Sequence, residues 1–170
     1  MKILVLNSGS SSIKFQLINM EQESVLARGQ VSRIGNEEPQ LSYKNESEEI
    51  KEVINIDDHG EGLEVIKNYL LGEETGVIES AEDIDAVGHR VVHGGEKYPE
   101  SVLVTEKVKQ EIEDLCDLAP LHNPHNLKGI EVCEELFPGT PQAAVFDTSF
   151  HQTLSPRAYL YGLPYEYYQK

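Results

Sequence analysis

The sequence contains no tryptophan and is poor in cysteine, with only two cysteines among its 170 residues. Cys116 and Cys133 both lie beside apolar residues in segments with a helical pattern, which favours buried free thiols over a disulfide or half of a metal site. A reducing compartment, the cytoplasm, is therefore expected. Long apolar runs are also absent, because the N-terminal run MKILVL turns polar at Asn7 after barely one strand. We expect neither a signal peptide nor a membrane span.

Basic residues are scarce as well: 14 Lys and Arg stand against 30 Asp and Glu, which gives a formal net charge of −16. Such a surface repels nucleic acid and anionic lipid, so neither is expected as a partner. Acidic runs such as ESEE at residues 46–49 are interpreted as solvated surface. The length and the 39% hydrophobic content suffice for the core of one domain, or of one half of something larger.

Alternating patterns at the start of the chain predict an antiparallel meander, and mixed patterns after it predict an α/β domain. The expected strands cover residues 2–6, 13–19 and 24–32, followed by a hairpin of residues 41–44 and 53–56 around the charged insert 45–51. After Asp58 the period becomes helical as far as Gly72. The later elements expected are a strand at residues 84–92, a helix capped by Thr105, a helix with Asn123 as cap and Pro124 at its first position, and a buried strand at residues 143–146.

The segment NSGSSS, residues 7–12, joins two of these strands, and Lys14 follows it closely. Gly9 lets the backbone approach a ligand, backbone N–H groups and hydroxyls can donate to phosphate oxygens, and Lys14 supplies positive charge. Ser12 and Lys14 share a face if the second strand has begun at Ser12. An ordinary polar hairpin turn is the alternative. The segment is not a Walker A loop, because GxxxxGK followed by Ser or Thr is absent and a strand comes next.

The segment GHRVVHGG, residues 88–95, ends another strand. By alternation Arg90 and Val92 face the same way. A guanidinium beside a small apolar side chain suits a short carboxylic acid, since it pairs with the carboxylate while valine packs on the alkyl part. An exposed arginine on an edge strand is the alternative, but the double glycine favours the close approach of a ligand or of another backbone.

The segment LHNPHN, residues 121–126, leads into a helix N-terminus. There His122 can donate a hydrogen bond to a phosphoryl oxygen, and the helix dipole adds to the positive field. A zinc site formed by His89, His93, His122 and His125 is the weaker alternative. H-x3-H on a strand is poor spacing for chelation, and no HExxH motif occurs.

Asp147 leaves the last buried strand at its carboxyl end, which is the usual ligand edge of an open α/β sheet. A carboxylate in this position can hold Mg²⁺ through water or act as a base. Its alternative role is to cap a helix or turn.

Taken together, LVLNSGSSSIKF, GHRVVHGGE, LAPLHNPHN and VFDTSFH, in this order and at these separations, resemble the acetate kinase family. The resemblance runs from residue 1 to about the end of the chain. It implies an α/β fold of the ribonuclease H-like, actin-like ATPase type, with a mixed sheet that begins as an antiparallel meander and is flanked by helices. Residues 1–150 would be the N-terminal kinase domain, and residues 151–170 an aromatic segment leading toward a C-terminal nucleotide-binding domain that is not in this chain.

The implied reaction converts ATP and acetate into ADP and acetyl phosphate, with Mg²⁺ or Mn²⁺ as cofactor and ATP as co-substrate. By resemblance, Asn7 belongs to the metal site. Ser10, Ser12 and Lys14 belong to the phosphate-binding turn, and Lys14 is associated with ATP.

By the same resemblance, Arg90 binds the substrate, and Val92 and Leu121 line the acetate pocket. His122 lies near the transferring phosphoryl group, and Asp147 is an active-site carboxylate often described as a proton donor or acceptor. A carboxylic acid with a pKa of about 4 to 5 is already ionised at neutral pH, so the nucleophile needs no base. Positioning and charge neutralisation are expected to dominate.

Members of this family are more than twice as long as this chain, so we expect this piece to lack full activity. By the same resemblance, we expect the full-length protein to be a homodimer. Propionate or butyrate kinase is the nearest alternative function. A stand-alone anion-binding module without catalysis is the alternative from another class.

Overall fold

The computed structural model describes residues 1–169. Its elements follow in the order β1 (Lys2–Gly9), β2 (Ser12–Asn19), β3 (Ser24–Ser32), β4 (Gln40–Asn45), β5 (Glu49–Val53), α1 (His59–Leu71), η1 (Ala81–Asp83), β6 (Ala86–Val91), β7 (Val102–Leu103), α2 (Glu106–Asp114), α3 (Asn123–Leu136), β8 (Gln142–Phe146), η2 (Asp147–His151), α4 (Pro156–Tyr159) and η3 (Tyr165–Tyr167).

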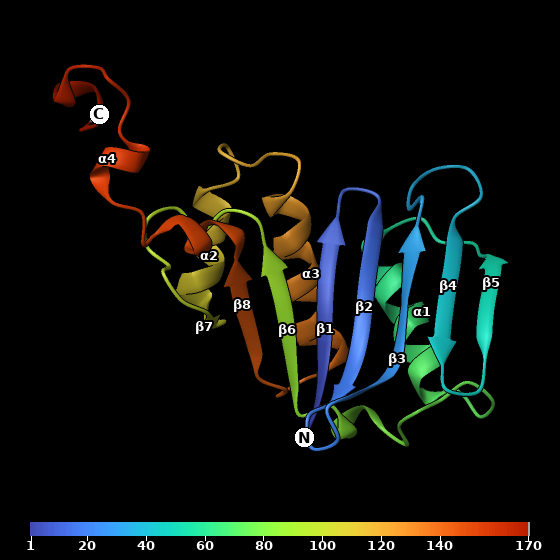
Figure 1. Ribbon diagram of the computed structural model, residues 1–170. Helices are drawn as coiled ribbons and strands as arrows, with labels where there is room; N and C mark the ends of the chain where they lie inside the picture. Colours follow the sequence, from blue (N-terminus) through green and yellow to red (C-terminus); the bar gives the residue numbers. More distant parts are fainter. Residues whose placement is uncertain (170) are drawn as a thin grey trace.

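All eight strands join one sheet in the order β5-β4-β3-β2-β1-β6-β8-β7 (Figure 1). The first five pair antiparallel with their sequence neighbours, which confirms the predicted meander. β6 and β8 then run parallel to β1, and the short β7 pairs antiparallel with β8. The mixed sheet therefore combines a meander with the parallel core of an α/β fold.

One predicted strand is wrong. The sequence predicts the second strand of the hairpin at residues 53–56, but β5 occupies residues 49–53, and residues 49–51 of this strand belong to the segment interpreted as a charged insert. The Asn45 side chain accepts hydrogen bonds from the backbone of Ser47 (2.8 Å) and Glu48 (2.7 Å), so the chain turns back at once. β5 is an edge strand with charged, exposed side chains, and such edges resist unwanted pairing.

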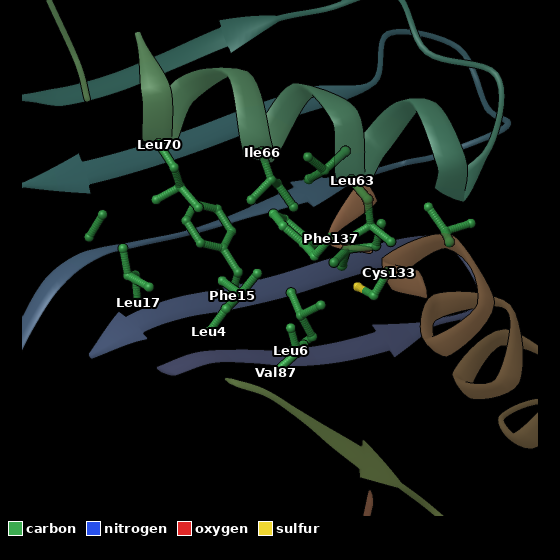
Figure 2. Close-up of a cluster of buried hydrophobic side chains, with 14 of the residues drawn as sticks. Leu4, Leu6, Phe15, Leu17, Leu63, Ile66, Leu70, Val87, Cys133 and Phe137 are labelled. Atoms are coloured by element: carbon green, nitrogen blue, oxygen red, sulfur yellow. The ribbon is translucent and has the colours of Figure 1, made fainter. Parts of the chain in front are cut away.

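Helices α1 and α3 cover one face of the sheet, and α2 packs beside α3 (Figure 1). Apolar side chains from alternate strand positions meet those of the helices on this face. Figure 2 shows Phe15 and Leu17 of β2 facing Ile66 and Leu70 of α1, with Cys133 of α3 at the side. Both cysteines are free thiols, as predicted, but only Cys133 is buried as expected, because Cys116 is half-buried.

The helix starts follow local signals with one exception. Thr105 caps α2 as predicted, since its hydroxyl accepts from the Val108 backbone at 3.3 Å. For α3 the prediction is wrong by one residue: His122 is the cap residue, and Asn123 and Pro124 both lie in the first turn. Asn123 is buried and uses its amide for bonds to other segments, so it is not available as a cap.

After β8 and η2 the chain leaves the sheet. Residues 152–169 are mostly exposed, include several tyrosines, and extend beyond the end of the sheet (Figure 1). Gln152 donates to the Gly95 carbonyl at 2.9 Å and the Tyr168 hydroxyl donates to Glu96 at 3.4 Å. The division of the chain near residue 150 stays a prediction. Within the described part of the chain, no helix has the length and apolar character needed to cross a bilayer.

Helix α3 approaches β1 very closely at Gly129. A Cβ atom on Gly129 would lie 2.5 Å from Ser8 Oγ and 3.1 Å from Ser8 Cβ. Ser8 is itself buried, and its hydroxyl has no hydrogen-bond partner among the described residues. The contact therefore depends on the small size of both residues, and the Ser8 hydroxyl contributes no hydrogen bond to it among the described residues.

We expect Gly129→Ala to lower the free energy of unfolding by about 1 kcal/mol, because overpacking outweighs the gain in helix propensity. Ser8→Ala alone should be neutral or stabilising by up to about 1 kcal/mol, since it removes an unpaired buried hydroxyl. In the Ser8→Ala background the loss caused by Gly129→Ala should disappear. Urea unfolding of the four proteins measures this coupling, and purely additive changes would contradict it.

Candidate active site

The polar residues singled out from the sequence gather at one edge of the sheet. β1, β6 and β8 run parallel, so their carboxyl ends meet at the same edge. The β1–β2 turn and the loop before α3 lie at this edge too (Figure 1). Ligands of open α/β sheets bind at the carboxyl ends of the strands.

The β1–β2 hairpin places Asn7 directly opposite Lys14, and Gly9 opposite Ser12. Directly paired residues have side chains on the same face, and so do residues two apart on one strand. Asn7, Ser12 and Lys14 therefore share the sheet face opposite the helices. The prediction that Ser12 and Lys14 lie on one face is confirmed. Ser10 is exposed in the turn itself.

A hollow of about 560 Å³ lies on this open face. Asn7 and Lys14 line it from the hairpin, and Arg90 lines it from β6. Val5 adds an apolar side chain and Arg28 a third cation. The hollow thus brings together a residue of the candidate metal site, a residue of the phosphate turn and the candidate substrate arginine.

Arg90 is held by Asp147, which follows the end of the adjacent strand β8. The guanidinium donates from Nε to Oδ1 at 2.9 Å and from Nη2 to Oδ2 at 2.7 Å, a bidentate geometry. These bonds raise the pKa of Arg90, and partial burial opposes them. Both side chains are about half exposed (51% and 42%), so the pair orients the guanidinium more than it stabilises the fold.

The other predicted residues lie at the same edge but not in this hollow. Val92 follows the end of β6 and is half-buried. Leu121 is 71% exposed, so the described chain does not enclose an apolar pocket around it. His122 is exposed, and its side chain does not cap α3, which leaves the ring at a helix N-terminus.

Two buried asparagines were missed by sequence reasoning as part of the site. Asn123 accepts from the His93 backbone N–H (3.1 Å) and donates to the His93 carbonyl (2.9 Å). Asn126 bonds to backbone groups of both β1 and the end of β6. Their signal in the sequence is two amides three residues apart at a helix start, a spacing that puts them on one face of the helix.

Two stacked histidines, His59 and His125, lie beside the β1–β2 turn, and His59 contacts its backbone. His59 Nε2 lies 2.6 Å from the Gly9 carbonyl oxygen, so this nitrogen carries the proton, because a carbonyl only accepts. The His59 ring stacks on His125 with centroids 5.2 Å apart. Burial lowers the pKa of His125, and the neighbouring His59 and His122 lower it further. The phosphate turn is thereby tied to the N-terminal ends of α1 and α3.

His89 belongs to the core. It is 3% exposed, and its Nε2 lies 2.5 Å from the Gln142 side-chain oxygen. Burial lowers its pKa from 6.5 to about 4, and the bond to Gln142 opposes this shift. Over residues 1–169, no group of three or more His, Cys, Asp or Glu side chains is arranged to hold a metal ion.

The buried, neutral His89 should make stability depend on pH. Between about pH 6.5 and pH 4 the unfolded chain carries a proton on this ring and the folded chain does not, so stability falls as the pH falls. From pH 7.5 to pH 5 the loss due to His89 should be about 2 kcal/mol. Urea unfolding of His89→Gln at the two pH values should show a loss smaller by that amount. His151→Gln, at an exposed histidine, should match the wild type, and equal losses in all three proteins would refute the assignment.

The sheet order, the helices on one face and the polar edge define an α/β domain of the actin-like ATPase fold. The chain belongs to the acetokinase family, whose family model matches residues 2–170. It is 57% identical over 171 residues to the acetate kinase of Halothermothrix orenii, covering 100% of this chain and 43% of that protein. The chain thus spans about two fifths of the length of the curated relatives it matches.

Solved structures show the same relationship. The crystal structure of Porphyromonas gingivalis acetate kinase superposes with a TM-score of 0.93 at 44% identity, over 99% of this chain and 42% of that one. A propionate kinase from Francisella tularensis gives a TM-score of 0.87 at 39% identity, over 97% of this chain and 41% of that one. The predicted family and fold are confirmed.

Proposed function

We propose that this chain is the substrate-side domain of an ATP-dependent acetate kinase, which transfers the terminal phosphoryl group of ATP reversibly to the carboxylate of acetate. The observation that carries the proposal is Arg90, oriented by Asp147 at the carboxyl edge of the sheet, beside a hollow that Lys14 and Asn7 also line. Family membership and the names of the relatives support it.

Arg90 binds the acid in this proposal. Asp147 occupies Nε and Nη2, and no bond from Nη1 to another described residue competes for the guanidinium. An incoming carboxylate can pair with the remaining donors while Asp147 keeps the plane of the guanidinium fixed. Val92 and Leu121 would contact the methyl group, and the exposure of Leu121 means that the ligand or a further part of the protein completes that pocket.

Ser10, Ser12 and Lys14 form the phosphate side. Their hydroxyls and ammonium group suit the oxygens of a polyphosphate, and Lys14 has no carboxylate partner among the described ion pairs. Asn7 offers one neutral oxygen donor for Mg²⁺. This fits an ion that takes most of its ligands from substrate phosphates and water, and Mg²⁺ would supply charge neutralisation on the transferring group.

The acid is ionised at neutral pH, so its oxygen attacks phosphorus without a base. The protein must bring two anions together and offset their repulsion. Arg90 neutralises the acid, Lys14 neutralises the nucleotide phosphates, and the exposed His122 at the N-terminus of α3 can donate to a phosphoryl oxygen. In this proposal Asp147 acts by holding Arg90.

The proposed arrangement of the whole protein follows from the length of the relatives. Residues 1–150 would form this domain, and residues 151–170 would lead to a second domain that binds the adenosine of ATP. We propose a homodimer in the cytoplasm for the full-length enzyme. The 170-residue chain alone should then give no sustained turnover in a hydroxamate assay, and sustained turnover would refute the two-domain site.

Arg90→Ala in the full-length enzyme should raise KM for acetate and lower kcat, because binding and charge stabilisation are both lost. We expect kcat/KM to fall by at least about 100-fold, as for removal of a charged partner of the substrate. Arg33→Ala is the matched control, since Arg33 is exposed and, among the described residues, forms an ion pair only with Glu38 at 3.9 Å. Steady-state kinetics with acetate decide, and unchanged constants in Arg90→Ala would exclude Arg90 from the acid site.

The likeness to a propionate kinase makes propionate the second candidate substrate. One methylene in an apolar pocket changes transition-state binding by about 1 to 3 kcal/mol, so acetate should be preferred over propionate by about 10-fold or more, and butyrate should be poorer still. The ratio of kcat/KM for the three acids measured side by side tests this order. A larger kcat/KM for propionate would assign the enzyme to that substrate.

A further inference from the structure

The strands that carry the two halves of the proposed site separate just where the site begins. β1 and β6 pair in parallel from Ile3 with Ala86 to Leu6 with His89. The Val87 N–H points to the other side and bonds to Pro141, so alternate amides, those of residues 88, 90 and 92, face β1. A continuous ladder would bring the Val92 N–H to the Ser8 carbonyl.

Instead, the carboxamide of Asn126 lies between these two groups. Its Oδ1 accepts from the Val92 N–H at 3.1 Å, and its Nδ2 donates to the Ser8 carbonyl at 2.6 Å. Because an N–H only donates and a carbonyl only accepts, the orientation of the amide is fixed. The side chain is 3% exposed, so water does not substitute for it. Asn126 thus spaces the two strand ends by the width of one amide group.

This spacing separates the phosphate side from the acid side. Ser8 is flanked by Asn7, and Val92 follows Arg90 by two residues on the same strand end. We propose that Asn126 is a positioning residue, which sets the distance between the acid held at Arg90 and the phosphates held on the β1–β2 turn. The proposal rests on the function proposed above and adds a residue that touches neither substrate.

The chemistry of the side chain supports this role over simple helix packing. A leucine of the same size would leave the Ser8 carbonyl and the Val92 N–H buried without partners, and an aspartate would turn an acceptor toward an acceptor. A glutamine is longer by one methylene. Among these side chains, only asparagine both fits the gap between the strands and can pair with the Val92 N–H and the Ser8 carbonyl. Asn123 does a different task, since both of its backbone bonds at the sheet go to one residue, His93.

The first test concerns the bridge itself. In Asn126→Ala, amide hydrogen exchange at Val92 should become at least about 10-fold faster, because the local protecting bond is lost. The control is Ile130→Val, a fully buried residue one turn further along α3 in the apolar cluster that includes Val91, which weakens packing near the end of β6 but leaves the Asn126 hydrogen bonds in place. In Ile130→Val, the exchange rate at Val92 should change only as far as the loss in the free energy of unfolding of that variant accounts for. Unchanged exchange in Asn126→Ala would overturn the bridge.

The second test uses the full-length enzyme. With Arg90 and Lys14 intact, Asn126→Ala should lower kcat by about 100-fold, the cost of misplacing reactants by about 1 Å. KM for acetate and for ATP should change by less than about 3-fold, since each substrate keeps its own contacts. Ile130→Val should keep kcat within about 2-fold when rates are referred to folded protein.

The outcomes separate the two proposals. If the wild type lacks acetate-dependent ATP turnover, the proposed function fails, and the exchange data still judge the bridge. If the wild type is active and Asn126→Ala matches Ile130→Val in kcat, the positioning role is overturned. Should Asn126→Ala not fold, Asn126→Ser decides by the same criteria, because serine retains a polar group but is too short to reach both partners.

Discussion

The parallel pairing of β1 with β6 is the interaction on which the rest of the structure depends. It joins the antiparallel meander to the later βα units, and it brings residues 83 positions apart in the chain into register, as in Leu6 with His89. The apolar face of this pair is covered by α3, which comes close enough only because Gly129 has no side chain where Ser8 lies. The β1–β2 turn and Arg90, the candidate phosphate and substrate groups, thereby reach the same edge of the sheet.

At that edge the fold uses polar side chains where backbone pairing has stopped. Asn126 takes the place of a ladder hydrogen bond between β1 and β6, Asn123 ties the chain after β6 to α3, and His59 holds the carbonyl of Gly9. These groups are buried or nearly so, and each has a partner of the correct polarity. A site built on strand ends is flexible unless such bonds fix the ends, so the rigidity of this edge of the sheet comes from the two amides and the imidazole.

Local signals in the sequence predicted most of the elements. One error arose at a local turn formed by Asn45, and another where the partners of a residue are distant in the chain. Thr105 caps a helix by contacting residues three positions away, which a pattern can show. The pattern did not predict β5 because the hydrogen bonds of one side chain, Asn45, reverse the chain within an acidic run. The local pattern predicts Asn123 as a cap because its partner, His93, lies 30 positions away, and the partner of Asn126 in β1 lies 118 positions away. The motifs named the candidate residues of the site, but only the fold shows which of them share the hollow and that Asp147 holds Arg90.

The net charge of −16 opposes the binding of the two anions in the proposed reaction, and the distribution of charge in the domain resolves this conflict. The hollow is lined by Lys14, Arg28 and Arg90, with no carboxylate among the described residues that line it. Screening at physiological ionic strength limits the effect of remote acidic side chains to about 8 Å, so an anion that has reached the hollow interacts mainly with the three cations. The carboxylate of Asp147 at the margin then removes part of the charge of Arg90. An arginine held in this way attracts an anion while binding it less tightly than an unpaired arginine would, which would suit the proposed reversible reaction, in which acetate and acetyl phosphate must both leave.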